Sequence, residues 1–313
     1  MNKSLIRRYL EFIRFSHTVF ALPFAALACV WALVVPVSVE IHWTPAMIAV
    51  RLTGVLLCMV TARSAAMAFN RLVDAHADAA NPRTARRHLP AGELTRGQAW
   101  GFFCAMCGLF LASCTLFLPN WLPLAGAVPV LLWICSYSLA KRFTSWVHLW
   151  LGIALALSPI CAWIAMRGEQ VSVTPLDLWP ALVLAAAIAC WVAGFDIIYA
   201  CQDADFDRQQ GLRSLPARLG INNALWVAAA LHACMLAVWG VLPWLVPQLS
   251  LGWLYAGAWS VVAVLVVRQH WIVRPNSDSP LNLGRINEAF FQINALISFL
   301  LSGVAVVDSF LGS

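Results

Sequence analysis

Nine long apolar stretches, separated by short polar segments, dominate the pattern of this chain. Each has roughly the 20 residues that a helix needs to cross the hydrocarbon core of a bilayer. Helices are the expected form, because a helix satisfies its backbone polar groups internally when lipid surrounds it. The pattern predicts membrane-spanning helices at residues 17–35, 46–69, 98–118, 121–140, 145–166, 178–201, 222–246, 250–268 and 287–310.

The composition excludes an ordinary soluble domain, because 62% of the 313 residues are hydrophobic and only 11% are charged. We therefore expect an all-α fold: a single domain over residues 1–313, built as a polytopic membrane bundle of nine transmembrane helices with cytoplasmic cap loops. Residues 1–16 are typical of a cationic amphipathic helix at a membrane interface. No small-residue cleavage site follows, so we interpret the first span as retained and not as a signal peptide.

Basic residues gather in alternate loops, and this distribution predicts the orientation of the helices. By the positive-inside rule, the amino terminus and the basic loops face the cytoplasm, and the carboxyl terminus lies outside. Arg167 is the exception, since it falls in a segment that would lie outside. The net charge of +6 is thus a signal of topology and gives no reason to expect nucleic acid as a partner. The residues that indicate this orientation are Lys3, Arg7, Arg8, Arg14, Arg71, Arg83, Arg86, Arg87, Arg96, Lys141, Arg142, Arg208, Arg213, Arg218, Arg268, Arg274 and Arg285.

A polar segment, residues 68–92, follows the second apolar stretch and begins with regularly spaced oxygen-bearing side chains. Asn70, Asp74 and Asp78 are spaced at every fourth residue, so a helix would place them on one side. Like charges at this spacing repel each other, which predicts that a cation binds among them.

A second acidic segment, residues 193–220, follows the sixth apolar stretch. On a continuous helix with about 100° per residue, Asp196, Tyr199, Asp203 and Asp207 fall within an arc of about 80°. Three carboxylates and a phenol would then share one helix face where the helix leaves the membrane. Acidic residues placed at random in loops would rarely fall on one helical face in two separate motifs. This argues against the alternative that the aspartates only keep the loop ends solvated.

Two carboxylate clusters of this kind favour Mg²⁺ bound together with a polyanion. Carboxylates about 4 Å apart repel each other by something like 4 kcal/mol at reduced dielectric unless a cation lies among them. Mg²⁺ characteristically binds one or two carboxylates together with phosphate oxygens and water. Basic loops beside apolar helices suit a diphosphate that carries a lipid tail. If that tail is allylic, departure of the diphosphate forms a carbocation that the site must shield from water.

The two clusters follow the second and sixth predicted spans, so they share one orientation, as in a parallel internal repeat. If the halves are repeated in space, the acidic faces oppose each other across a central cavity of the bundle. The competing hypothesis is a divalent-cation-binding membrane transporter, which predicts acids near mid-bilayer; here they gather at one membrane face. Cys104 and Cys107 lie inside an apolar stretch and are interpreted as small apolar residues.

At these two motifs the chain resembles the UbiA family of intramembrane aromatic prenyltransferases, over essentially its whole length. The motifs read Asn70-Arg-Leu-Val-Asp74-Ala-His-Ala-Asp78 and Asp196-Ile-Ile-Tyr199-Ala-Cys-Gln-Asp203-Ala-Asp-Phe-Asp207. The resemblance implies Mg²⁺-dependent transfer of a polyprenyl group from a polyprenyl diphosphate to an aromatic hydroxyacid acceptor in quinone biosynthesis, through an allylic carbocation and with release of diphosphate. It also implies an integral protein of the bacterial inner membrane, in contact with membrane lipid.

The resemblance further assigns roles to side chains in and around both motifs. The implied Mg²⁺ ligands are Asn70, Asp74, Asp78, Asp203 and Asp207. The implied catalytic residues are Asp196, which would orient water or act near the acceptor, and the aromatic rings of Tyr137 and Tyr199, which would stabilise cationic charge. The implied substrate-binding residues are Lys141, Arg142, Arg83, Arg213 and His17. For the last three, ordinary loop or interface residues are the alternative interpretation.

One segment distinguishes the candidate acceptors. Relatives that act on 4-hydroxybenzoate usually carry Asp-Lys-Pro at the start of the first span, where this chain has Phe15-Ser-His-Thr18 and Ala21-Leu-Pro23. That form is more similar to relatives in the futalosine route to menaquinone, whose acceptor would be 1,4-dihydroxy-6-naphthoate. The sequence therefore leaves both acceptors open.

Overall fold

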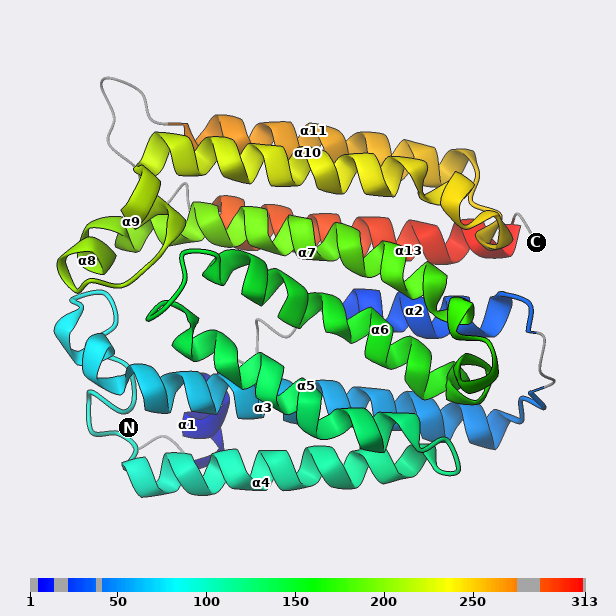
Figure 1. Ribbon diagram of the computed structural model, residues 1–313, viewed down its shortest axis with the longest axis horizontal. Coiled ribbons are helices and arrows are strands. Elements are labelled where there is room, and N and C mark those ends of the chain that lie inside the picture. The colour runs from blue at the N-terminus through cyan, green and yellow to red at the C-terminus, as the bar shows by residue number, and fades with distance from the viewer. Residues whose placement is uncertain (1–4, 14–21, 38–40, 275–287, 312–313) are drawn as a thin grey trace. The chain divides into compact units, whose positions relative to one another are not determined.

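The computed structural model describes residues 5–13, 22–37, 41–274 and 288–311, which are folded almost entirely as helices (Figure 1). No β-strand occurs in this part of the chain. The chain divides into two compact units. The first contains the described residues up to 13 and residues 43–139, and the second contains the described parts of 20–42 and 140–313.

The all-helical membrane fold expected from the sequence is confirmed. Over the described residues, eight helical runs are long and apolar enough to cross a membrane. The span expected at 17–35 is represented by α2 (Leu22–Val34), a shorter apolar helix, and residues 17–21 lie outside the described part. The eight runs are Pro45–Ala80, Arg96–Phe117, Leu122–Ala140, Val147–Val173, Pro175–Gln209, Ile221–Leu245, Trp253–Val273 and Phe291–Leu311.

Helix α3 is the longest helix of the first unit and extends further than its apolar pattern predicts. It begins at Pro45 after Thr44, whose Oγ1 accepts a hydrogen bond from the Met47 N–H (3.2 Å) and so caps the helix. Helical geometry continues to Ala80, because no helix breaker occurs before Asn81-Pro82. The first acidic motif therefore lies on the last turns of a 36-residue helix. The helices of this unit are α1 (Leu5–Phe12), α3 (Pro45–Ala80), α4 (Arg96–Cys114) and α5 (Leu122–Ala140).

Helix α1 packs its apolar side against other helices of the first unit. Phe12 and Ile13 are buried in a cluster with Leu72 of α3, and Tyr9 stacks on Phe102 of α4 with ring centroids 4.8 Å apart. The amphipathic helix expected over residues 1–16 is thus described over 5–12, and its apolar residues contact protein. Its place at a membrane interface stays a prediction.

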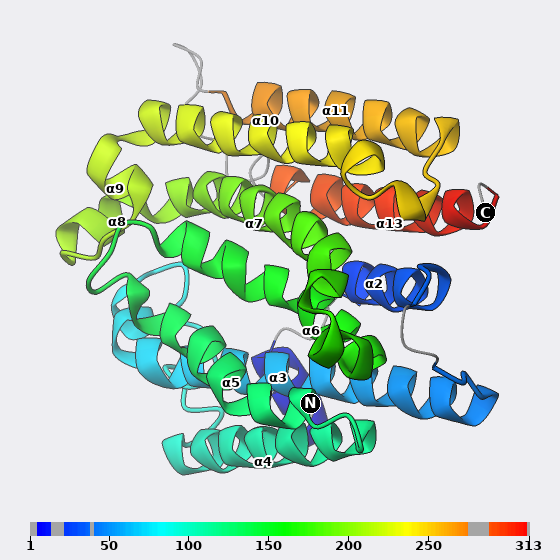
Figure 2. The same ribbon diagram turned by 45° about the vertical axis from the view of Figure 1, so that its right-hand side comes forward.

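Helix α7 forms the centre of the second unit, and α6 and α10 pack against it (Figures 1 and 2). Most of its side chains are buried. Helix α11 runs beside α10, and α13 packs against α2 and α11. The helices of this unit are α2, α6 (Val147–Val173), α7 (Trp179–Ala200), α8 (Ala204–Gln209), α9 (Leu215–Leu219), α10 (Ile221–Leu245), α11 (Trp253–Val273) and α13 (Asn294–Leu311).

Two glycines allow the neighbours of α7 to approach it closely. A side chain at Gly152 of α6 would press on the backbone carbonyl of Ala189 in α7, and one at Gly194 of α7 would press on the ring of His232 in α10. Small residues at helix contacts are typical of membrane bundles, where close packing holds the helices together in the absence of a hydrophobic driving force. The two glycines thus determine how closely α7 packs against α6 and α10.

Replacing Gly152 by alanine is expected to lower the free energy of unfolding by about 1–3 kcal/mol. The added methyl group fits only if the α6 and α7 backbones separate. The matched control is Gly257→Ala in α11, where an added methyl group meets nothing within 4 Å and helix propensity improves. Thermal unfolding in detergent measures both variants. A melting temperature of Gly152→Ala at or above that of the control would contradict this packing.

Arg167, the exception to the charge pattern, is fully buried and connects two helices of the second unit. Its guanidinium donates to the carbonyl oxygens of Val35 (2.6 Å) and Pro36 (3.0 Å), just beyond the C-terminus of α2. Carbonyl groups at a helix C-terminus lack partners within the helix, so a cation satisfies them well. An ion pair with Asp177 balances the charge. The position of Arg167 is therefore explained by these contacts and does not conflict with the orientation expected from the loops.

Candidate functional site

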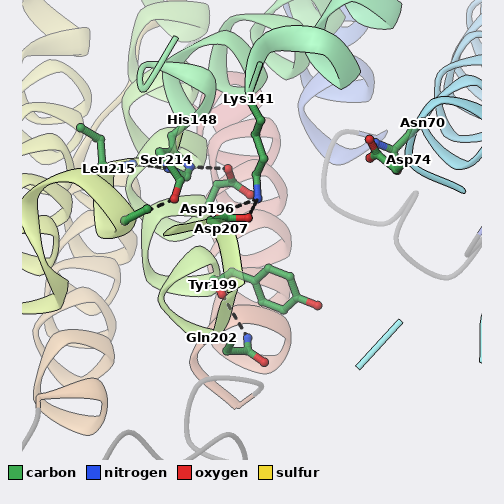
Figure 3. Close-up of polar contacts among 11 residues, drawn as sticks. Asn70, Asp74, Lys141, His148, Asp196, Tyr199, Gln202, Asp207, Ser214 and Leu215 are labelled. Atoms are coloured by element: carbon green, nitrogen blue, oxygen red, sulfur yellow. Dashed lines mark hydrogen bonds and ion pairs between the residues drawn. The ribbon is translucent and has the colours of Figure 1, made fainter. Parts of the chain in front are cut away.

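The first acidic motif presents a bonded amide–carboxylate pair on α3 (Figure 3). The Asn70 side chain donates from Nδ2 to Oδ2 of Asp74 at 2.8 Å, and both residues are half-buried. They lie one helix turn apart, as the four-residue spacing predicts. The pair places an amide and a carboxylate side by side at the polar end of an apolar helix, and their oxygen atoms are the donors that a hard cation prefers.

The third residue of the motif, Asp78, is buried and bound to a loop arginine. Nη1 of Arg87 lies 2.6 Å and 2.8 Å from the two carboxylate oxygens of Asp78. The Thr84 hydroxyl donates to the backbone carbonyl of Asp78 at 3.1 Å. These contacts fold the loop after α3 back onto the helix end. The proposed metal role of Asp78 stays a prediction, and in the structure its carboxylate is engaged by Arg87.

The second acidic segment is not one continuous α-helix, so the helix face expected to be shared by Asp196, Tyr199, Asp203 and Asp207 holds only for Asp196 and Tyr199, which both lie on α7, and is wrong beyond Ala200. Helix α7 ends at Ala200, a 3₁₀ turn covers Cys201–Asp203, and α8 follows. Asp203 departs from α-helical geometry at φ −106° and ψ 7°. A 3₁₀ turn has about 3 residues per turn in place of 3.6, so residues beyond it rotate away from the arc calculated for an α-helix.

Asp207 forms a buried ion pair with a residue that the sequence assigns to substrate binding. Nζ of Lys141 lies 3.1 Å and 2.9 Å from the two carboxylate oxygens of Asp207 (Figure 3). The Arg213 backbone N–H donates to the Lys141 carbonyl at 2.7 Å, and Nη1 of Arg213 donates to the Phe143 carbonyl at 2.7 Å. The loop after α8 is thus attached to the segment after α5. In these contacts the Arg213 guanidinium binds backbone.

Asp196, the catalytic candidate on α7, is bonded to His148 at the start of α6. Nδ1 of His148 lies 2.7 Å from Oδ2 of Asp196. His148 carries no sequence signal of a functional role, because the residue begins an apolar stretch with no motif around it. The remaining predicted residues are placed as follows. Tyr137, Tyr199 and Asp203 are half-buried, Arg83 and Arg142 are exposed, and His17 lies outside the described residues.

Arg63 is a second candidate functional residue that lies outside both acidic motifs. It lies at the middle of α3, seven residues before Asn70, and a helix places residues at this spacing on nearly the same side. Its buried Nε has no hydrogen-bond partner among the described residues. An ionisable side chain inside an apolar span is by default a functional candidate, and this signal was present in the sequence.

The donor set fits Mg²⁺ of the kind that is bound together with a substrate. The described residues contain no group of three or more His, Cys, Asp or Glu side chains arranged to hold a metal by themselves. Mg²⁺ needs only one or two carboxylates when phosphate oxygens and water complete its coordination. The Asn70–Asp74 pair by itself offers oxygen donors of that number and kind.

Sequence comparisons relate the chain to known proteins. A sequence model described as the UbiA prenyltransferase family matches residues 21–294. A 4-hydroxybenzoate octaprenyltransferase from Burkholderia pseudomallei (strain 668) is 28% identical over 269 residues, which cover 85% of this chain and 86% of that protein. A mitochondrial 4-hydroxybenzoate polyprenyltransferase from Caenorhabditis elegans is 33% identical over 168 residues, and the match spans 53% of this chain and 45% of that relative.

Solved structures show the same fold. The apo structure of a UbiA homolog from Aeropyrum pernix K1 superposes with a TM-score of 0.78 at 30% identity, covering 94% of this chain and 98% of that one. A UbiA homolog from Archaeoglobus fulgidus bound to GPP and Mg²⁺ superposes with a TM-score of 0.64 at 18% identity. The match covers 95% of this chain and 99% of that one. At the lower identity the similarity shows the fold alone.

Proposed function

Because this chain belongs to the UbiA prenyltransferase family, we propose that it transfers a polyprenyl group from a prenyl diphosphate to an aromatic hydroxyacid with Mg²⁺ as its cofactor. The observation that carries the proposal is the position of the acidic clusters, each at the polar end of an apolar helix. Asn70 and Asp74 end one such helix, and the segment with Asp196 and Asp203 ends another. Lipid-linked diphosphates need this combination of oxygen ligands and apolar surroundings.

Asn70, Asp74 and Asp203 are the residues that we expect to hold the metal against the diphosphate. When bound, Mg²⁺ would neutralise the diphosphate and assist its departure from the allylic carbon. Asp78 and Asp207 would join them only after releasing Arg87 and Lys141. The chain therefore offers a primary set of ligands and two further carboxylates that basic residues occupy in the structure.

Lys141 would bind the diphosphate by exchanging its ion-pair partner. Its side chain is 31% exposed, whereas that of Asp207 is 2% exposed, so the lysine is the member of the pair that can turn toward a ligand. A diphosphate oxygen would accept its ammonium hydrogen bonds, since charge-assisted bonds to phosphate are strong. This exchange would also free the Asp207 carboxylate for the metal.

The aromatic acceptor would carry a carboxylate, because the half-buried Arg63 offers a cation inside an apolar span, and its buried Nε has no hydrogen-bond partner among the described residues. The names of the relatives favour 4-hydroxybenzoate, and the segment Phe15–Thr18 favours 1,4-dihydroxy-6-naphthoate. In either acid the ring carbon ortho to the hydroxyl would bond to the allylic carbon and then lose its proton. Tyr137 and Tyr199 would stabilise the allylic cation by about 0.5–2 kcal/mol. Arg142, beside Lys141, would contact the diphosphate or the acceptor carboxylate, and Arg83, Arg213 and His17 stay weaker candidates for substrate binding.

The reaction can be tested in membranes that contain the protein. Mg²⁺, a long polyprenyl diphosphate and either acid are added, and products are identified by mass spectrometry. The expected product is the acid plus one prenyl group, with one diphosphate released per product and no turnover in EDTA. Membranes without the protein are the control. Absence of a prenylated product with both acids would overturn the proposed substrate class.

The protein is an integral membrane protein with helices suited to spanning a bilayer. We place the acidic clusters on the cytoplasmic side of a bacterial inner membrane, because the basic loops predict that orientation. Membership of the UbiA prenyltransferase family favours a transferase over the divalent-cation-binding transporter.

A further inference from the structure

A buried histidine connects the second acidic segment to the loop that follows it. His148 lies in the first turn of α6, and its side chain is 1% exposed. Nδ1 of the ring lies 2.7 Å from Oδ2 of Asp196, and Nε2 accepts a hydrogen bond from the Leu215 backbone N–H at 3.4 Å (Figure 3). Three segments that are distant in the sequence thus meet at one imidazole ring.

These contacts determine where the proton of the ring lies. Because the Leu215 N–H points at Nε2, that nitrogen carries a lone pair, and the proton lies on Nδ1, which donates to Asp196. A neutral His148 therefore binds Asp196 without cancelling its negative charge. Lys141, in contrast, neutralises Asp207.

The hydrogen bond restricts the Asp196 carboxylate to one orientation. Its side chain is only 13% exposed, and a carboxylate in such surroundings needs a donor. His148 engages Oδ2 and leaves Oδ1 for a further bond. Tyr199 follows Asp196 by one helix turn on α7, so the oriented carboxylate and the phenol lie on the same side of the helix.

The loop that contains Leu215 is itself attached to the segment of Lys141. The Arg213 backbone N–H donates to the Lys141 carbonyl at 2.7 Å, and Ser214 is fully buried and caps α9 by accepting a bond from the Ala217 N–H at 3.3 Å. The position of the Leu215 N–H is therefore fixed by its neighbours on both sides. His148 receives a fixed donor on one nitrogen and presents a fixed donor to Asp196 on the other.

We propose that His148 is a positioning residue for prenyl transfer, which holds Asp196 as an oriented carboxylate without touching substrate. This inference rests on the proposed function, because it assigns Asp196 to the chemical step. Residues that orient a functional side chain in this way typically change activity by about 10- to 100-fold when they are removed. The role requires only the Nδ1 donor and a fixed ring.

The kinetic test compares His148→Ala with His148→Asn. We expect His148→Ala to lower kcat by about 10- to 100-fold and to change KM for the prenyl diphosphate by less than about twofold, since diphosphate is bound elsewhere. In His148→Asn the amide can donate to Asp196 from the position of Nδ1, so most of kcat should return. Ser172→Ala, near the other end of α6, is the control. Equal kcat values in His148→Ala and wild type, or equal losses in both variants, would overturn the proposal.

A double-mutant cycle with Asp196→Asn tests whether His148 acts through Asp196. If it does, adding His148→Ala to Asp196→Asn lowers kcat little further. Multiplicative losses in the double variant would overturn the proposal.

Nitrogen-15 NMR of labelled protein in detergent gives a reading that is independent of turnover. We expect the ring of His148 to carry its proton on Nδ1 in the wild type, with the signal assigned by its loss in His148→Asn. A proton on Nε2, or on both nitrogens, would contradict the inference even in an active enzyme. If wild type is inactive but the Nδ1 proton is found, the proposed function fails and the bond to Asp196 stands.

Discussion

Replacing Asp74 or Asp203 by asparagine is expected to lower the Mg²⁺-dependent rate of prenyl transfer by about 100- to 1,000-fold. Each substitution nearly preserves the size of the side chain and removes the negative charge that would hold the metal. Asp74 is half-buried and bonded to Asn70, so the change at this position leaves packing nearly intact. The measurement is the initial rate of product formation in membranes, together with thermal unfolding of each purified variant.

Asp205 provides a matched control within the same motif. It lies between Asp203 and Asp207, its side chain is 83% exposed, and it pairs with the exposed Arg208 at 3.0 Å. Exposed ion pairs contribute little, so we expect Asp205→Asn to keep the rate within about twofold of wild type. A loss in Asp205→Asn as large as that in Asp203→Asn would show that the assignment of metal ligands is wrong.

Replacing Lys141 by methionine is expected to affect both stability and substrate binding. The change leaves the Asp207 carboxylate, 2% exposed, without its cation, and breaking a buried pair in this way costs about 3–5 kcal/mol. The loss of stability in Lys141→Met should fall at the lower end of this range, because Lys141 is partly exposed. The KM for prenyl diphosphate should also rise at least about tenfold, since one charge-assisted contact to phosphate is lost. Arg208→Met, which removes an exposed cation from the same region, is the control.

The double variant Lys141→Met with Asp207→Asn separates the two effects. Removing both charges leaves no unpaired ion, so most of the lost stability should return. The KM should stay high, because the cation that binds diphosphate is still absent. If Lys141→Met is unstable but keeps a wild-type KM, Lys141 only supports the structure and the proposed exchange of partners is wrong.

The helices of this fold could be predicted from the sequence because each apolar stretch has the length that a bilayer demands. The residues at which the helices end were predicted less accurately. Hydropathy ends near residue 69, whereas α3 continues to Ala80, because backbone geometry continues until a breaker and does not depend on apolar side chains. In the second motif, the 3₁₀ turn at Cys201–Asp203 changes the direction of the later acids, and a fixed angle per residue misses this change.

The residue types of the candidate site could also be predicted, whereas their contacts could not. Spacing on one helix predicts the Asn70–Asp74 pair, which is a local contact. Lys141 and Asp207 are 66 residues apart, and His148 and Asp196 are 48 apart. Such pairs depend on how helices pack, which no local pattern encodes. The structure thus adds that two of the predicted acids are already bound to Arg87 and Lys141.

The central claim is that each acidic motif is required for Mg²⁺-dependent binding of a prenyl diphosphate. Its most direct test is equilibrium binding of a labelled, unreactive prenyl thiodiphosphate to the purified protein, with and without Mg²⁺, in wild type, Asp74→Asn and Asp203→Asn. We predict that the ligand binds only with Mg²⁺ and that binding is lost in either variant. Binding that does not need Mg²⁺, or full binding in either variant, would contradict the account.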